Sequence, residues 1–400
     1  MNGTTVRTLR TDEHRAASSL FRGALHLPPN TDAEWAGAAL AYQPGGAIGA
    51  FDPDLIGTSR SFDAELTVPG GARLPAAGIS GVGVRPDRTR RGVLRAMMTA
   101  QLEDFAARGV AFACLGASEA GIYGRFGFGL AGRRRTYEVD RHRARLTPGV
   151  PAGGRVELLD AGDATGVLPA VYDRIAHRPG MMTRPDVVWR LYEDLARREP
   201  APVKTVVHHG PDGPDGYACY TVTTEQERPK TRTLKLTDLV TGTPDAFAGL
   251  WRFLLGADLV DRIVAGSRPL DEPIELILAD HRVSQVTLIE DDHWVRLVDV
   301  PEALAAREYG AARPVVVAVD DPLLPANTGP YRITSDGAVR TDEPAALRCD
   351  AATLAMAYLG GWRLSALAGA GRVEVRDPAA LPDADALFAT RRPSWAGSYF

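Results

Sequence analysis

The segment that most limits how this chain can fold runs from residue 74 to residue 116. Its middle, 91–109, is predicted to be a helix, because apolar residues recur there at steps of three and four until Gly109 ends the pattern. These residues are Val93, Leu94, Met97, Met98, Leu102 and Phe105. A glycine-rich apolar stretch comes before the helix, and the short apolar stretch "VAFACLG" follows it. Strand, helix and buried strand in this order predict a mixed α/β domain.

The remaining sequence predicts further elements in three blocks. With 400 residues, two or three domains are expected. In the first block we expect a strand at 6–10, a helix at 11–25, strands near 46–54 and 65–70 that flank turn-rich segments, and a strand at 133–141. The Pro- and Gly-rich stretch 146–154 reads as a linker. The second block, to about residue 290, alternates helices (185–198, 244–256) with strands (203–209, 216–224, 232–240), and the third carries short helices at 350–361 and 384–390.

Composition and charge exclude several classes of protein. The net charge of −4 and the lack of a basic arm give no reason to expect a nucleic acid partner. No apolar run approaches the roughly 20 residues of a membrane span, and no signal peptide is recognised, so we expect a cytoplasmic protein without a membrane partner. Cys114, Cys219 and Cys349 are widely spaced and read as core thiols. His208 and His209 are adjacent and would point to opposite faces of a strand, so no metal site is expected.

The stretch "GVGVRPDRTRRGVLR", residues 81–95, carries the most chemistry. Free N–H groups at a helix start attract anions, and several arginines surround Gly92, where the helix begins. Gly81 and Gly83 indicate a bulge that would separate two neighbouring strands and expose backbone to a ligand. Coenzyme A fits both features, because it has amides in its pantetheine arm and a pyrophosphate at the far end. The alternative is a solvated arginine-rich turn before an ordinary helix.

These residues resemble the coenzyme turn of the GNAT acyltransferases, in the form found in the Eis (enhanced intracellular survival) family. The usual superfamily motif has Gln or Arg first and Gly fourth and sixth; Asp87, Arg90 and Gly92 stand there, so only the last glycine matches. "VRPDRTRRGVLRAM" is similar to the Eis coenzyme turn, "ASEAGIYGRFGFG" to its tyrosine motif and "WVRLVDVPEALAAR" to the opening of its third domain, and the chain ends on a phenylalanine. The resemblance extends over the whole chain.

The resemblance implies an α/β (α+β) fold of two GNAT-like mixed-sheet domains in tandem, followed by a sterol-carrier-protein-like domain. It implies a catalytic domain at 1–147, a GNAT-like domain without a coenzyme site at 148–290, and a third domain at 291–400 that supplies the C-terminal carboxylate. It also implies a homo-hexamer built as a dimer of trimers.

The resemblance implies a role for particular residues as well. Tyr123 would be the general acid and the α-carboxylate of Phe400 the general base, with Trp35 in the wall of the acceptor site. Acetyl-CoA, as cosubstrate, would contact Val82, Gly83, Val84, Arg90, Arg91, Gly92, Val93, Leu94, Arg95, Ser118 and Glu119. The alternatives are that Tyr123 only packs beside Phe126 and Phe128, that Phe400 is a frayed tail, and that Trp35 is a half-buried helix residue.

The implied reaction is the acetylation of amines. A tyrosine, with an ordinary pKa of about 10, keeps its proton at neutral pH and can donate it to the leaving thiolate. A terminal carboxylate, with an ordinary pKa near 3.5, would accept a proton better if it were partly desolvated, and burial of Tyr399 and Phe400 could anchor it. The resemblance implies aminoglycoside antibiotics as acceptors, at several positions. A polyamine, an arylalkylamine, a protein lysine, a longer acyl donor such as propionyl-CoA, or a coenzyme- or lipid-binding protein without turnover remain alternatives.

Overall fold

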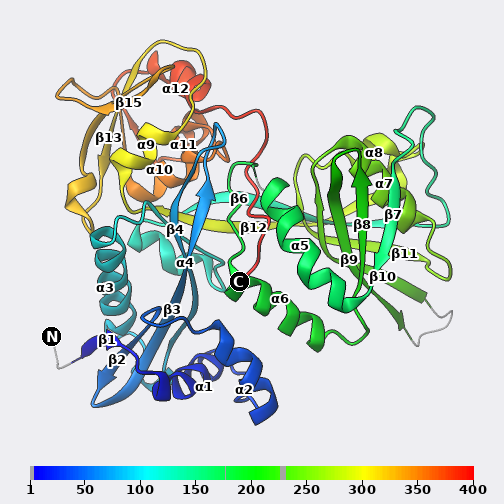
Figure 1. The fold of residues 1–400 in the computed structure, drawn as a ribbon. Coiled ribbons are helices and arrows are strands. Elements are labelled where there is room, and N and C mark those ends of the chain that lie inside the picture. The colour runs from blue at the N-terminus through cyan, green and yellow to red at the C-terminus, as the bar shows by residue number, and fades with distance from the viewer. Residues whose placement is uncertain (1–3, 176, 226–230) are drawn as a thin grey trace. The chain divides into compact units, whose positions relative to one another are not determined.

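The computed structural model of the chain describes residues 4–175, 177–225 and 231–400 (Figure 1). These residues form two compact units. Unit 1 takes its residues from 1–132, 178–191 and 291–400, and unit 2 takes its residues from 133–177 and 192–290. Unit 1 therefore includes a segment, 178–191, that lies within the range expected for the second domain. The three domain boundaries stay predictions.

The first sheet of unit 1 is mixed, with the strand order β1-β2-β3-β4-β5-β12. The strands are β1 (Thr5–Thr8), β2 (Ala47–Asp52), β3 (Asp54–Thr67), β4 (Arg73–Val84), β5 (Phe112–Leu115) and β12 (Ser284–Leu297, which begins in unit 2). β4 and β5 pair in parallel, and the pairs β1–β2, β2–β3, β3–β4 and β5–β12 are antiparallel. The parallel pair requires a crossover connection, and the predicted helix supplies it.

The helices of this part follow the sequence pattern closely. They are α1 (His14–Ala24), α2 (Asp32–Ala38), α3 (Val93–Ala107) and the short α4 (Ala120–Tyr123). α3 buries Val93, Met97, Met98, Leu102 and Phe105, so the predicted crossover helix is confirmed. α1 packs against β3 and β4, and α3 packs against β2, β3 and β4.

The expectation of turn-rich sequence between residues 54 and 65 was wrong. This stretch forms the body of β3, although Asp54, Gly57, Ser59 and Asp63 are poor strand formers. β3 pairs with β2 on one side and β4 on the other, and these two ladders override the local preference. Four consecutive residues of this stretch, 56–59, are buried.

The C-terminal part of unit 1 is a second sheet with helices beside it (Figure 1). Its order is β15-β14-β13-β16-β17, formed by β13 (Val315–Asp320), β14 (Gly329–Thr334), β15 (Gly337–Arg340), β16 (Leu347–Asp350) and β17 (Val373–Val375). The helices are α9 (Val300–Ala306), α10 (Ala351–Tyr358), α11 (Leu364–Gly369) and α12 (Ala380–Phe388), and α10 and α12 confirm two predicted helices. One hydrophobic core contains Leu74 and Phe112 of the first sheet together with Val317 of the second, which explains why both belong to one unit.

Unit 2 is built around a sheet of order β6-β11-β10-β9-β8-β7. Its strands are β6 (Gly129–Asp140, which begins in unit 1), β7 (Arg155–Leu159), β8 (Lys204–Gly210), β9 (Gly213–Glu225), β10 (Thr231–Thr241) and β11 (Arg262–Pro269). β10 and β11 pair in parallel and the other pairs are antiparallel. The helices are α5 (Ala161–Ile175), α6 (Asp186–Arg198, which begins in unit 1), α7 (Pro244–Leu255) and α8 (Ile274–Ile277). α5 and α7 pack on the sheet.

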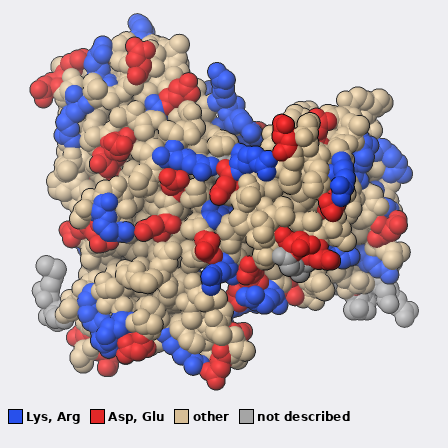
Figure 2. All heavy atoms as spheres, viewed as in Figure 1, with Lys and Arg blue, Asp and Glu red and all other residues tan. Residues whose placement is uncertain are grey.

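Several composition-based expectations can be compared with the structure. Cys114, Cys219 and Cys349 are free and buried, as predicted for core thiols. His208 contacts Asp215 and His209 contacts Glu157, so the two imidazoles do serve different partners. Figure 2 shows basic and acidic side chains intermixed over the visible face. Within the described residues, no helix is both long enough and apolar enough to cross a membrane.

Candidate active site

The C-terminal part of β4 does not pair with β5, so the β4 backbone has an unpaired edge on that side. The two strands pair only from Ala76–Phe112 to Ile79–Leu115, whereas β4 continues to Val84. On its other side β4 contains the predicted bulge: Thr58 pairs with Gly83 and Arg60 with Ser80, so two residues of β4 oppose one of β3. Gly81 supplies the left-handed backbone of this bulge, with φ +63°. The free edge therefore runs along Val82, Gly83 and Val84.

Gly83 has a role that the sequence did not indicate. A Cβ atom at this position would lie 3.0 Å from the Cα of Phe21 and 3.3 Å from the Cβ of Ala24. The glycine therefore allows α1 to approach the strand closely, while Gly81 alone carries the left-handed turn of the bulge.

The turn between β4 and α3 presents positive charge at the start of a 15-residue helix. Gly92, at the N-cap, and Arg90, two residues before it, both have positive φ, at +83° and +61°. For an arginine this conformation costs roughly 1–2 kcal/mol, and left-handed residues are typical of turns whose N–H groups converge on an anion. Arg90, Arg91 and Arg95 are exposed, and none of them forms an ion pair with a residue that the structure describes.

Two neighbouring arginines do have carboxylate partners. Arg85 donates two hydrogen bonds to Asp87, at 2.8 and 2.7 Å, and this contact lowers the pKa of Asp87 to about 2. Arg88 lies 3.8 Å from Asp52 and 3.7 Å from Asp87. The charge left without an acidic partner is thus concentrated at the helix start, where the first backbone N–H groups also lack intrahelical acceptors.

Tyr123 ends the short helix α4 and is 8% exposed. Its ring meets that of Phe128 edge-on, with centroids 6.0 Å apart, and shares a core cluster with Ile79 of β4 and Leu115 of β5. Its hydroxyl makes no hydrogen bond within the described chain. Burial, with a smaller contribution from the charge of Glu119, raises the pKa of Tyr123 to about 12. The phenol is therefore protonated at any physiological pH. Its oxygen stabilises no other group among the described residues by a hydrogen bond.

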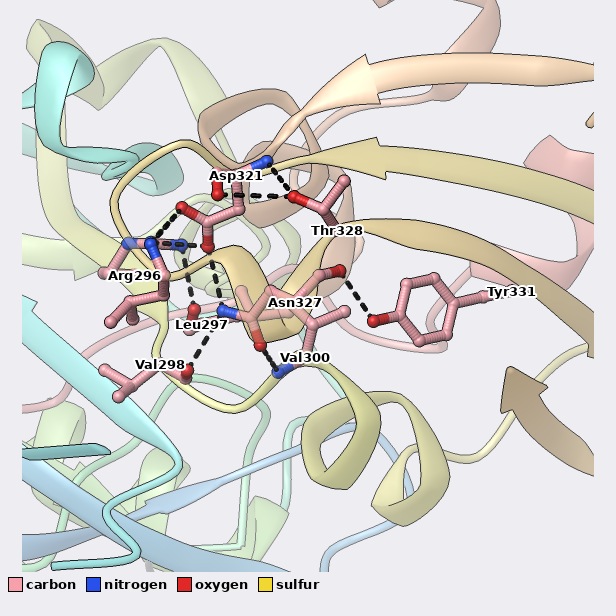
Figure 3. Close-up of polar contacts among 9 residues, drawn as sticks. Arg296, Leu297, Val298, Val300, Asp321, Asn327, Thr328 and Tyr331 are labelled. Atoms are coloured by element: carbon pink, nitrogen blue, oxygen red, sulfur yellow. Dashed lines mark hydrogen bonds and ion pairs between the residues drawn. The ribbon is translucent and has the colours of Figure 1, made fainter. Parts of the chain in front are cut away.

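The turn that follows Tyr123 is supported by a buried ion pair (Figure 3). Arg296 of β12 lies against Gly127, where a Cβ atom would come within 2.7 Å of Nε. Its Nη2 donates to both oxygens of Asp321, at 2.7 and 2.6 Å, and neither side chain is more than 2% exposed. Asn327 donates to Asp321 at 2.8 Å and to the carbonyl of Val298 at 3.0 Å. The C-terminal part of unit 1 thereby stabilises the loop that carries the tyrosine motif.

The last residues of the chain are held by residues 178–184 of unit 1, which begin with a turn at 178–180. Arg178 donates to the carbonyl of Pro393 at 2.7 Å, and Trp395 N–H donates to Pro179 at 3.0 Å. Arg184 donates to Ser398 Oγ at 3.0 Å and to the carbonyl of Gly397. This order contradicts a frayed tail.

The other side of the tail is also fixed. Asp292 accepts the N–H of Ala396 at 2.5 Å, and Ser394 donates to the carbonyl of Ala131 at 2.6 Å. Tyr399 is 57% exposed, so the expectation that burial of its ring anchors the end was wrong. The hydrogen bonds of residues 393–398 and the packing of the Phe400 ring against Phe62 hold the end instead.

Phe400 lies in a small pocket beside β4. Its ring meets that of Phe62 edge-on at 4.8 Å, and Phe62 covers Gly78 of β4. The pocket is small and open to solvent, and the roughly 270 Å³ of empty space at it includes that open solvent. Its walls are residues 60–62 of β3, Ser80 of β4, residues 187, 188 and 191 of α6, Ala41 and Phe400. Ser80 directly precedes the bulge, so the pocket adjoins the unpaired edge.

The remaining predicted residues lie around these features. Ser118 and Glu119 are exposed between β5 and α4, and Glu119 is the N-cap of α4. Trp35, in α2, is partly buried and packs 5.8 Å from the ring of Tyr42, which in turn receives the guanidinium of Arg60 at 5.4 Å. Trp35 itself does not line the pocket.

The structure thus brings the predicted coenzyme residues, Tyr123 and Phe400 to β4 and its ends, all within unit 1. Sequence reasoning missed Arg60, Phe62 and the three α6 residues of the pocket, as well as Arg178 and Arg184. The segment "RPGMMTRP", 178–185, contains a Pro-Gly turn signal and ends on a proline, which indicates irregular chain. Nothing in a single sequence connects it with residues more than 200 positions away.

Comparison with known families gives three matches that together span most of the chain. Residues 5–131 and residues 180–298 each match the acetyltransferase (GNAT) domain, and residues 300–397 match the sterol carrier protein domain. These matches confirm the predicted fold of two acetyltransferase-like domains followed by a sterol-carrier-protein-like domain.

Individual proteins are similar over nearly the whole length. An uncharacterized N-acetyltransferase of Streptomyces avermitilis is 40% identical over 87% of this chain and 88% of its own. N-acetyltransferase Eis of Mycobacterium tuberculosis is 36% identical over 85% of this chain and 84% of its own. The crystal structure of Eis1 from Mycobacterium abscessus superimposes with a TM-score of 0.91 at 39% identity, covering both chains completely. A GCN5-related N-acetyltransferase from Anabaena variabilis, 19% identical with a TM-score of 0.85 over both full chains, shares the fold.

Proposed function

The chain belongs to the Eis family of GNAT N-acetyltransferases, and on that basis we propose that it transfers the acetyl group of acetyl-CoA to amines, with aminoglycoside amines among the acceptors. The observation that carries this proposal is the conjunction at β4 of an unpaired backbone edge, an arginine-rich helix start and a tyrosine hydroxyl that bonds to none of the described residues.

We assign the coenzyme to unit 1. Its pantetheine amides would pair with the backbone of Val82, Gly83 and Val84. Its pyrophosphate would take the N–H groups of residues 92–95 together with the side chains of Arg90, Arg91 and Arg95. Two negative phosphates at this position would be stabilised by the helix start and by three arginines that have no acidic partner among the described residues. Ser118 and Glu119 would border the thioester end.

The corresponding turn in unit 2 is unsuited to a coenzyme, which supports the proposal of one coenzyme site, in unit 1. β10 and β11 also pair in parallel and separate after Leu236–Ala265, and α7 follows β10. The side chain of Thr243, however, already caps Ala246 N–H at 3.0 Å, and Pro244 has no N–H to offer. The carboxylate of Asp215 accepts from Thr243 Oγ1 at 2.7 Å. Because this turn has no arginine and carries a carboxylate, it would repel a pyrophosphate.

The proposed chemistry needs three proton transfers. Phe400, through its α-carboxylate, would take a proton from the acceptor ammonium, directly or through a water. The amine nitrogen then bonds to the thioester carbon and the C–S bond breaks. Tyr123 gives its proton to the departing sulfur, and the proton that the nitrogen loses returns to the phenol through solvent. Because the pKa of Tyr123 is raised to about 12, its hydroxyl is protonated before each turnover.

The acceptor is the least constrained part of this proposal. Aminoglycosides, acetylated at several positions, are the acceptors that the family resemblance suggests, and Trp35 would stand near them. A polyamine, an arylalkylamine or a protein lysine are the alternatives. A second candidate, an amine that also carries a carboxylate, is favoured by Arg60 in the pocket wall.

Two further properties are proposed on the family resemblance alone. We propose a homo-hexamer arranged as a dimer of trimers, which light scattering would report as about six times the chain mass of 42.8 kDa. We also propose that the protein acts in the cytoplasm, which cell fractionation would check.

Thiol release from acetyl-CoA tests the enzyme proposal. The protein is incubated with acetyl-CoA and, in turn, kanamycin, tobramycin, spermidine and phenethylamine, and products are identified by mass. An amine-dependent release of thiol with one added acetyl group per thiol is expected. A protein that binds coenzyme but releases no thiol above the background of the amine alone would be a coenzyme-binding protein and would contradict the proposal.

A further inference from the structure

Arg60 is an unexpected residue in the wall of this pocket, because its positive charge would repel a cationic acceptor. It lies on β3, pairs through its backbone with Ser80 of β4, and packs its side chain against Gly81 of the bulge, where a Cβ atom would be 3.2 Å from Nε. It therefore stands directly beside the edge that we assign to pantetheine. Its only described side-chain contact besides this packing is the ring of Tyr42, 5.4 Å from the guanidinium carbon.

The charge of Arg60 has no acidic partner within the described residues. Burial lowers the pKa of Arg60, but an arginine keeps its proton at neutral pH under any ordinary perturbation. Arg60 is partly buried. A partly buried charge without a counter-ion is unfavourable, and the nearby ring of Tyr42 compensates it only in part. An arrangement of this kind favours the arrival of an anion.

The rest of the wall is suited to an apolar ligand. Its apolar side chains are those of Phe62, Val187, Val188, Leu191 and Phe400. Besides Arg60, its polar residues are Ser61 and Ser80. Among the described residues that line the pocket, none is aspartate or glutamate. A polycation would find only one acidic group among the described lining residues, the terminal carboxylate of Phe400, and would also face Arg60. A single carboxylate would match the planar fork of the Arg60 guanidinium.

We propose that Arg60 makes this acetyltransferase prefer acceptors that carry a carboxylate and an apolar body besides the amine. The carboxylate binds the Arg60 guanidinium, while the body packs at the open mouth of the pocket against Phe62 and the first turns of α6. This inference rests on the proposed function, because it names the acceptor class of that same site. Aminoglycosides, which lack a carboxylate, are then the poorer acceptors.

Matched acceptors test the preference. The pair 4-(aminomethyl)benzoate and 4-(aminomethyl)benzamide has the same shape and amine but differs in charge, and ω-aminocarboxylates with two to five methylenes, each with its carboxamide, cover the unknown spacing. The ratio of kcat/KM for carboxylate over carboxamide is measured with acetyl-CoA on wild type, Arg60→Gln and Arg60→Lys. Because both acceptors of a pair meet the same protein sample, loss of folded protein cancels in the ratio.

We expect the best-spaced carboxylate to be favoured by about tenfold or more in wild type, as for other charge-assisted contacts. The ratio should fall close to one in Arg60→Gln and stay between these values in Arg60→Lys, which keeps the charge and loses the fork. A wild-type ratio near one, a ratio unchanged in Arg60→Gln, or a preference for kanamycin over every aminocarboxylate overturns the inference. So does an equal loss of kcat for both members of a pair in Arg60→Gln, which would mean that Arg60 acts on Phe400 rather than on the acceptor.

Failure of the proposed function gives a different result. If no amine releases thiol, the acetyl-transfer proposal fails, and the preference is measured as binding by calorimetry. The carboxylate member of the best pair should then bind wild type at least about tenfold more tightly than its carboxamide, and Arg60→Gln should bind the two equally. Equal binding by wild type would overturn the inference.

Discussion

Replacing Tyr123 with phenylalanine separates its proposed chemical role from a packing role. The substitution removes one oxygen from a side chain that packs beside Phe126 and Phe128 and makes no hydrogen bond within the described chain. No protein donor or acceptor is left unpaired, so the free energy of unfolding should change by less than about 0.5 kcal/mol. Tyr123→Ala is the less informative variant, because emptying an aromatic site in the core costs about 3–5 kcal/mol.

The effect on turnover should be much larger than the effect on stability. Loss of a positioned proton donor typically lowers kcat by about 10²–10⁴-fold, which corresponds to roughly 3–5.5 kcal/mol of barrier. The dissociation constant of acetyl-CoA should stay within about twofold, because the phenol contacts the reacting end and not the phosphates. Thiol release, calorimetry with coenzyme A and thermal unfolding measure the three quantities on one preparation.

Tyr309 provides a matched control. Its hydroxyl donates to the carbonyl of Leu304 at 2.8 Å in the core of unit 1, away from the candidate site. Tyr309→Phe should therefore cost about 1–3 kcal/mol of stability and leave kcat unchanged. A Tyr123→Phe protein with wild-type kcat, or one in which kcat and unfolding temperature fall together as in an aromatic core mutant, would refute the assignment of Tyr123 as the acid.

Four further outcomes are expected. Arg91→Gln should raise the KM of acetyl-CoA about tenfold at low salt with kcat nearly unchanged, and by less at high salt; an effect on kcat alone would contradict a phosphate contact. One glycine added after Phe400 moves the carboxylate by about 3.5 Å and should lower kcat at least tenfold, as measured by thiol release, and a wild-type rate would rule out its role as base. Asp321→Ala leaves Arg296 buried without its counter-ion and should lower the free energy of unfolding by about 3–5 kcal/mol in denaturant titration; a change under 1 kcal/mol would show that the pair is dispensable. With the pKa of Tyr123 raised to about 12, kcat should not decline up to about pH 10, and an alkaline fall near pH 8 would exclude this phenol as the group that titrates.

Local sequence patterns predicted the elements that carry the coenzyme edge. The periodicity of Val93, Met97, Met98 and Leu102 specified α3 within two residues at each end, and the glycines before it indicated the bulge that Gly81 forms. These features depend on neighbours in the chain, so a single sequence contains them. The positive φ of Arg90 was not predictable, because its neighbours force an arginine into a conformation that it does not prefer.

Features built by distant residues were missed for a common reason. β3 was read as turns because its stability comes from ladders with β2 and β4. The five strands of the second sheet are short and border Gly, Pro and Asp residues, which weakens their alternating pattern. The pocket joins residues 60–62, 187–191 and 400, and the contacts of Arg184 with the tail span 213 and 214 residues. Only the folded chain shows that Arg60 forms no ion pair with an acidic side chain among the residues that the structure describes.

The most direct test of the central claim is a crystal structure of the protein with coenzyme A and an acceptor amine. The account predicts pyrophosphate density at the start of α3 among Arg90, Arg91 and Arg95, pantetheine along Val82–Val84, and the sulfur within hydrogen-bonding distance of the Tyr123 hydroxyl. Coenzyme bound at the α7 turn of unit 2, or a sulfur that Tyr123 cannot reach directly or through one water, would contradict it.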